Sequence, residues 1–159
     1  MKYFFLESDI AGEPGGNTVL DHSKTPPTVR KLEYNFYYWF GDVLLRTYRS
    51  WIITAAAMNE IQKHGFTGAK AAEVSITKSD DFCEQNPSLI LPEFVWLKVF
   101  GTAGRDDFGT GYRLNAGSID LFPYDARFYE LVVSERALDL LKRLGIAHAS
   151  VWTFSEPST

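Results

Sequence analysis

The side chains that most often carry catalytic or metal chemistry are few and far apart in this chain. The three histidines, His22, His64 and His148, do not lie at metal-ligand spacing from one another or from the single cysteine, Cys83. His64 falls at the end of a predicted helix, where the helix dipole favours a cation. No histidine is tied to Cys83 by sequence, so a catalytic thiol is not indicated. These residues predict no nucleophile, no metal site and no cofactor.

Two carboxylate pairs, Asp80-Asp81 and Asp106-Asp107, have the residue types for divalent-ion binding or acid/base chemistry. Adjacent side chains on a strand point to opposite faces, so both acids converge only if a loop bends them inward. We therefore expect solvated loops. Gly101–Gly111 lacks the ending of a phosphate-binding loop and is not a dinucleotide fingerprint. Asp107-Phe108-Gly109 matches a kinase tripeptide, but the catalytic His-Arg-Asp is missing and the chain is too short for that fold.

Composition narrows the class of protein. A chain of 159 residues with 45% hydrophobic residues predicts one globular domain with its own core. The net charge of −4 argues against nonspecific binding to nucleic acid or to an anionic membrane, because both need clustered Lys and Arg. No stretch has the length of a signal h-region or of a spanning helix, and a single cysteine excludes an internal disulfide. We expect a cytoplasmic protein.

Two similar segments, Trp51–Gly65 and Leu131–Gly145, must position whatever site exists. Each reads as a short apolar strand, a hydroxyl N-cap at Thr54 or Ser134, an amphipathic helix and a glycine stop. Each leads into a further strand, at Ala72–Ile76 or Ser150–Phe154. The pattern predicts an α+β domain with a mixed or antiparallel sheet, a few short helices and a possible duplicated strand-helix-strand unit, around residues 51–76 and 131–154.

The remaining elements are read from turn residues and hydrophobic alternation. Glu93–Phe100 is apolar on both faces, which is typical of a central strand covered on each side. Asp42 is expected to cap a short turn through Val43–Leu45. Further expectations are strands at Lys2–Leu6 and Thr28–Tyr34, a long loop at Ala11–Pro27, and a hairpin joining Tyr112–Leu114 to Ile119–Phe122.

The strings FVWLKVFGTAGRDDFG (Phe94–Gly109) and LVVSERALDLLKRL (Leu131–Leu144) together resemble a family of bacterial immunity proteins from polymorphic-toxin and contact-dependent competition systems. Tyr3–Leu6, Asn17–Asp21, Trp39 and Gly41-Asp42 are also similar to that family. The resemblance covers most of the chain and is densest in its second half. Residues Thr110–Tyr129 make the passage into the last helix longer than the family pattern.

The resemblance implies an inhibitor without catalytic activity that binds one cognate toxin domain and blocks its active site or its access to substrate. No catalytic or binding residues follow from it, so the interface is predicted from physical chemistry. Acidic groups speed association with the basic surfaces of toxins that act on nucleic acids, and exposed aromatic residues serve as anchors. The predicted interface comprises Arg105, Asp106 and Asp107, the acids Asp80, Asp81 and Glu84, and the aromatic residues Tyr37, Tyr38 and Trp39.

Other classes of function remain open on the sequence. One is a small-ligand or metal-binding regulatory module, or less readily a hydrolase, with the carboxylates of Gly101–Gly111 as metal ligands. The five aromatic residues of Phe36–Phe40 are typical either of a covered core segment or of a protein-binding anchor. They also permit self-association, so we expect a monomer or a weak homodimer.

Overall fold

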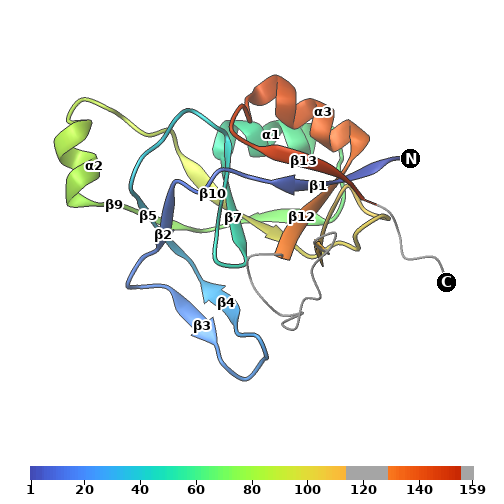
Figure 1. Cartoon of the computed structure of the whole chain (residues 1–159), viewed down its shortest axis with the longest axis horizontal. Coiled ribbons are helices and arrows are strands. Elements are labelled where there is room, and N and C mark those ends of the chain that lie inside the picture. Colours follow the sequence, from blue (N-terminus) through green and yellow to red (C-terminus); the bar gives the residue numbers. More distant parts are fainter. Residues whose placement is uncertain (114–128, 155–159) are drawn as a thin grey trace.

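Short antiparallel strands dominate the structure, a computed structural model that describes residues 1–113 and 129–154 (Figure 1). The predicted α+β class is confirmed, with three short helices among the described elements. The expected hairpin between Tyr112–Leu114 and Ile119–Phe122 lies mostly outside the described residues. The strands are β1 (Tyr3–Glu7), β2 (Gly12–Pro14), β3 (Val19–Asp21), β4 (Thr28–Lys31), β5 (Glu33–Phe36), β6 (Leu44–Thr47), β7 (Ser50–Thr54), β8 (Ala69–Ala72), β9 (Ser75–Lys78), β10 (Phe94–Val99), β11 (Phe108–Tyr112), β12 (Tyr129–Ser134) and β13 (Ser150–Phe154).

The helices are α1 (Ala55–Lys63), α2 (Asp80–Gln85) and α3 (Glu135–Leu144). Both predicted N-caps are confirmed. The Thr54 hydroxyl accepts from the Ala57 amide, and the Ser134 hydroxyl accepts from the Ala137 amide. Gly145 follows α3 with a φ of +119°, a left-handed backbone that glycine adopts without strain.

The two four-stranded sheets have the same plan. Their strand orders are β6-β7-β10-β8 and β11-β12-β1-β13, and every pairing in them is antiparallel. We call β6, β7, α1, β8 and β10 the first unit, and β11, β12, α3, β13 and β1 the second unit. In each unit, a first strand (β6 or β11) is followed by the second strand with which it pairs (β7 or β12), and a helix comes next (α1 or α3). The chain then returns to the sheet as β8 or β13, which is separated from the second strand by β10 or β1. The duplicated unit predicted from sequence therefore has a structural counterpart.

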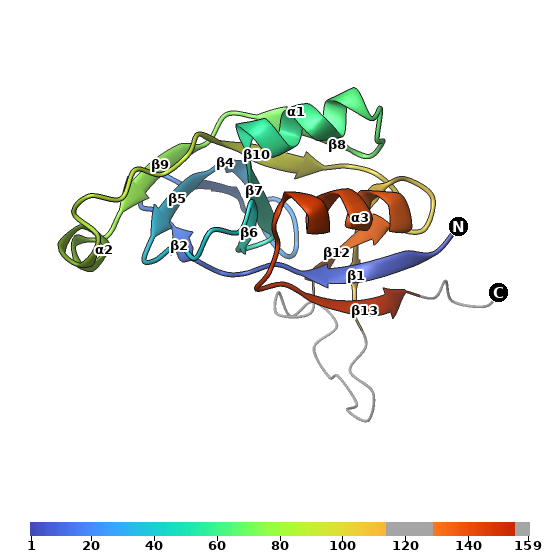
Figure 2. The ribbon, with the colours of Figure 1, turned by 90° about the horizontal axis from the view of Figure 1, so that it is seen from above.

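The hydrogen bonds at the two helix starts also correspond. The Ala55 amide donates to the Glu93 carbonyl just before β10, and the Glu135 amide donates to the Lys2 carbonyl just before β1. The strand inserted before the returning strand differs in origin. It is β10, from later in the chain, in the first unit, and β1, from the N-terminus, in the second unit. Helices α1 and α3 lie side by side over the sheets (Figure 2). One sequence boundary is wrong: the strand after α1 is Ala69–Ala72, and the predicted Ala72–Ile76 runs into β9.

Strand β10 is covered on both faces, as predicted. On one side, Leu97 joins Ile53, the apolar faces of α1 and α3, and Leu131 and Val133 of β12 in a main core. On the other side, Phe94 and Trp96 pack in a second core against Tyr34, Phe36 and Phe82. Phe100, predicted to continue one face of this strand, lies beyond it and is 67% exposed.

The N-terminal third builds a small three-stranded sheet, β2-β5-β9, and a hairpin, β3-β4. The expected long loop over Ala11–Pro27 is therefore interrupted by two strands, and the strand expected over Thr28–Tyr34 is broken between β4 and β5 because Leu32 turns into the second core. Helix α2 closes this sheet at the end of the molecule opposite the N-terminus (Figures 1 and 2). None of the helices within residues 1–113 and 129–154 reaches the length and apolar character required to cross a bilayer.

Candidate functional site

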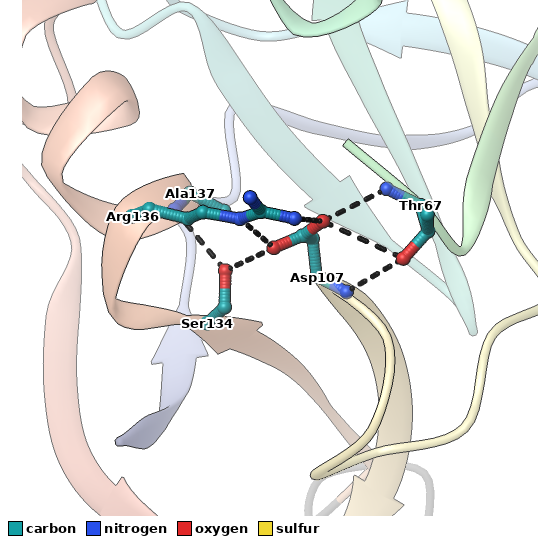
Figure 3. A network of polar contacts seen from close by, with 5 residues as sticks. All are labelled: Thr67, Asp107, Ser134, Arg136 and Ala137. Atoms are coloured by element: carbon teal, nitrogen blue, oxygen red, sulfur yellow. Dashed lines mark hydrogen bonds and ion pairs between the residues drawn. The ribbon is translucent and has the colours of Figure 1, made fainter. Parts of the chain in front are cut away.

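Asp107 is the centre of a buried polar network (Figure 3). It lies just before β11, is 3% exposed, and its Oδ1 and Oδ2 each accept from the Arg136 guanidinium at 2.7 Å. The Ser134 hydroxyl donates to Oδ1 at 2.7 Å, and the Thr67 amide donates to Oδ2 at 2.9 Å. One carboxylate thus joins the first turn of α3 to the loop after α1, linking the second unit to the first.

The electrostatics of Asp107 suit this linking role. Burial by itself raises the pKa of the carboxyl, but the hydrogen bonds from Arg136, Ser134 and Thr67 outweigh burial and bring the pKa down from 3.8 to about 2. The expectation that Asp106 and Asp107 are both solvated is therefore wrong for Asp107. Both of its oxygens already accept hydrogen bonds within the fold, and its place in the partner interface stays a prediction.

The rest of the 101–107 loop is also tied into the fold. Asp106 is half-buried, and its Oδ2 accepts from the Thr102 amide at 2.7 Å, while the side chain of Arg105 is exposed. The two neighbouring acids point into different hydrogen-bond networks and do not converge. Asp106 and Asp107 therefore do not form together the metal site that the sequence left open for this loop. The loop lies beside the N-terminus, at the end of the molecule opposite α2.

Asp42 occupies the corresponding position in the first unit. It is 2% exposed and lies just before β6, and its Oδ2 accepts from the His148 amide at 3.0 Å. Its Oδ1 lies 2.7 Å from His148 Nδ1. The expectation that Asp42 caps a turn through Val43–Leu45 is wrong, because the carboxylate reaches across to the loop after α3 instead. The two units are therefore linked reciprocally. Asp107 of the second unit binds the loop after α1, and Asp42 of the first unit binds the loop after α3.

A second carboxylate distinguishes the Asp42 link from the Asp107 link. One ligating atom each from Asp9, Asp42 and His148 lie within 4.8 Å of one another. Burial first, and then the neighbouring Asp42 carboxylate, raises the pKa of Asp9, whereas the hydrogen bond to Asp42 raises the pKa of His148. This cluster could not be predicted from the sequence, because its members are separated by 33 and 106 positions and share no motif.

The acids Asp80, Asp81 and Glu84 are all exposed, as expected. The expectation of a loop for Asp80 and Asp81 is wrong, because all three acids lie on the helix α2. The Ser79 hydroxyl caps this helix by accepting from the Phe82 amide at 3.1 Å. Acidic side chains in a first helical turn are favourable, so their placement also has a local structural reason. Cys83 is exposed on the same helix.

The aromatic run begins beside α2. Phe36 pairs with Lys78 across β5 and β9, and the Ser79 amide donates to the Phe36 carbonyl at 2.9 Å, so the segments that follow both strands leave the sheet together. Tyr37 is 42% exposed and Phe40 is 64% exposed, whereas Phe36 is buried in the second core. The run is thus part core and part surface.

Tyr38 and Trp39, both predicted as anchors, have their polar atoms engaged within the chain. The Tyr38 hydroxyl donates to the Ile10 carbonyl, and the Trp39 indole N–H donates to the Asp42 carbonyl at 2.9 Å. Both rings are half-buried. Phe40, which the sequence prediction omitted, stacks on Tyr38 at 4.7 Å between ring centroids and is the most exposed ring of the run.

A pocket of about 150 Å³ opens where the β6–β7 hairpin turns beside β10. The cations Arg49 and Lys98 line it together with aromatic rings. Ser50 Oγ and Trp51 Nε1 also belong to its lining residues, and both atoms are buried with no hydrogen-bond partner among the described residues. Donors left unsatisfied in a cationic, aromatic pocket suit a small anion.

No protein-family model matches the chain, and no curated protein matches it significantly.

Proposed function

We propose that this protein is an immunity-type inhibitor that binds a cognate toxin domain through its α2 end and blocks the active site or substrate access of that domain. The observation that carries the proposal is that the aromatic run, with two exposed rings, starts at Phe36, whose carbonyl accepts from the amide of Ser79 at the start of the acidic helix α2. Tyr37 and Phe40 present apolar surface, and α2 presents Asp80, Asp81 and Glu84 to solvent.

Three physical properties support a protein partner at this surface. Aromatic side chains supply much of the binding energy at interface centres, because they desolvate a large area with few rotatable bonds. The rigid second core beneath them, which contains Phe36 and Phe82, keeps the segment ordered before binding. Exposed carboxylates next to the rings favour a basic partner and accelerate its association.

The first step is to examine the gene next upstream: the inhibitor proposal expects it to encode a large secreted protein with a variable C-terminal domain, and that domain is then the binding partner in the test. We expect nanomolar-range binding by biolayer interferometry and protection of cells when both proteins are co-expressed. Phe40→Ala is expected to weaken binding about tenfold or more, and to reduce protection in parallel.

Phe100→Ala is the matched control. Phe100 is 67% exposed, close to the 64% of Phe40, but it follows β10 near the 101–107 loop. Equal losses for the two variants would place the interface elsewhere. An adjacent gene product that neither binds nor is neutralised would contradict the inhibitor proposal itself.

A second candidate function rests on the pocket beside β10. Its unsatisfied Ser50 and Trp51 donors and its two cations favour a small carboxylate or phosphate as ligand. Specific binding stabilises the folded state by mass action, so a saturable rise in melting temperature with acetate or inorganic phosphate, abolished by Arg49→Gln, would support this function. Identical melting curves with and without either anion would remove it.

A further inference from the structure

We infer that Asp9, Asp42 and His148 form a binding site for one divalent transition-metal ion. The three residues come from the end of β1, the entry to β6 and the loop between α3 and β13, so the fold, not the local sequence, brings them together. The site would be additional to the proposed toxin-binding function and does not depend on it.

The first argument is geometric. The three ligating atoms lie within 4.8 Å of one another, whereas neighbouring ligands of a zinc ion are roughly 3.5 Å apart for bonds of about 2.0–2.2 Å. Small side-chain rotations close that gap. The His148 amide donates to Asp42 at 3.0 Å, and the Asp9 carbonyl accepts from the Arg46 amide at 2.9 Å. The backbone of two ligands is therefore fixed before any ion arrives. The bond between Asp42 Oδ1 and His148 Nδ1 is the contact that an ion would replace.

The second argument is an unsatisfied acceptor. Asp9 Oδ2 is buried and has no hydrogen-bond partner among the described residues, and the Tyr38 hydroxyl lies 3.5 Å from Oδ1. That hydroxyl is already committed to the Ile10 carbonyl. A carboxylate with one buried, unpaired oxygen, next to a second buried carboxylate, is favoured by a compensating positive charge. His148 supplies at most one such charge for two acids, and a divalent ion supplies both.

The ligand chemistry selects the class of metal. One imidazole and two carboxylates suit Zn²⁺ or Mn²⁺, whereas Ca²⁺ and Mg²⁺ favour sites made wholly of oxygen atoms. Three protein ligands leave at least one coordination position for water. An ion here would also join three segments of the chain, and the Phe40 ring that packs on His148 at 5.5 Å would rest on the joined segment.

The test is isothermal titration of Zn²⁺ into the full chain at pH 7.5, with Mg²⁺ as the comparison ion and melting temperature as a second readout. We expect one Zn²⁺ per chain, a higher melting temperature and no saturable Mg²⁺ binding. Asp9→Asn and His148→Gln should each lower Zn²⁺ affinity by about 100-fold or more, since outer-sphere changes alone cost 10–100-fold. The matched control is His64→Gln, an exposed histidine at the C-cap of α1, which should bind Zn²⁺ as the unmodified chain does.

Three results would overturn the inference. They are the absence of saturable Zn²⁺ or Mn²⁺ binding by the unmodified chain, undiminished binding by both Asp9→Asn and His148→Gln, and an equal loss in His64→Gln. The two test residues lie on separate segments, and His148 is exposed, so misfolding of one variant does not decide the outcome. Circular dichroism of the metal-free variants confirms that each is folded.

Discussion

The two units share a plan but neutralise their linking aspartates differently. In the second unit, Asp107 fastens the loop after α1, and the Arg136 guanidinium pairs with both of its oxygens at 2.7 Å. In the first unit, Asp42 fastens the loop after α3, but its neighbours are His148 and a second acid, Asp9. The charge of Asp107 is balanced by Arg136, whereas the group around Asp42 retains an excess of negative charge.

This difference separates structural from functional roles for one residue type. Asp107 lies far from α2, and its removal should affect folding alone. The Asp42 link lies beneath the aromatic run, since its carbonyl accepts from the Trp39 indole and Phe40 packs on His148. Uncompensated charge there, together with exposed rings above it, is why we propose that the binding properties of the protein lie around the aromatic run and not around Asp107.

The largest expected effect comes from breaking the balanced link. Asp107→Ala removes the charge-assisted bonds to Arg136 and the bonds to Ser134 and Thr67. We expect the free energy of unfolding to fall by about 3 kcal/mol, the lower part of the range for a broken buried pair, because the half-exposed Arg136 is rehydrated by water. Urea unfolding measures the change. Asp106→Ala, which loses one bond in an exposed turn, should cost less than about 1 kcal/mol. Equal costs would refute the structural role of Asp107.

The hydrogen bonds of Asp107 also make the free energy of unfolding depend on pH in the acid range. The pKa of Asp107 is about 2 in the folded chain and 3.8 ordinarily, so its ionised form stabilises the folded state above pH 4. That stabilisation is lost as the pH falls from about 4 to about 2. The stability difference between the unmodified chain and Asp107→Asn should therefore be constant from pH 7 to pH 5 and shrink below pH 4, as measured by urea unfolding at each pH. A difference that persists unchanged at pH 2 would contradict this assignment.

The helix caps give the next effect. Ser134 caps α3 and also donates to Asp107, whereas Thr54 caps α1, and no bond from its hydroxyl to a carboxylate is found among the described residues. Ser134→Ala should therefore cost about 2 kcal/mol and Thr54→Ala about 1 kcal/mol in the free energy of unfolding. Thermal or urea denaturation of both variants checks the order. If Thr54→Ala is the more destabilising, the two caps are not distinguished by the Asp107 link.

The smallest effect concerns the unbalanced link. In metal-free buffer, Asp9→Asn removes a buried negative charge that faces Asp42. We expect the free energy of unfolding to rise by about 1 kcal/mol or less, which is unusual for a substitution at a partly buried position. Chemical denaturation with a chelator present measures it. A clear loss of stability would show that Asp9 already has the compensation that the described contacts do not supply.

Sequence reasoning succeeded where the determining interactions are local. The caps at Thr54 and Ser134, the glycine after α3 and the two-faced strand β10 depend on neighbours within a few residues, or on hydrophobic alternation. It failed where the partner is remote. Asp107 meets Arg136 across 29 positions and Thr67 across 40, and Asp42 meets His148 across 106. Nothing near either aspartate distinguishes a buried link from a solvated acid, so only the paired arrangement of the two units assigns their roles.

We propose above that the α2 end binds a basic toxin domain. The most direct measurement is the affinity and association rate of the adjacent gene's C-terminal domain for three variants: Phe40→Ala, Asp80→Asn combined with Asp81→Asn, and Phe100→Ala as control. The account predicts about tenfold weaker binding for the first and a slower, less salt-dependent association for the second, with Phe100→Ala unchanged. Unchanged binding in both α2-end variants, with a loss in Phe100→Ala, would contradict it.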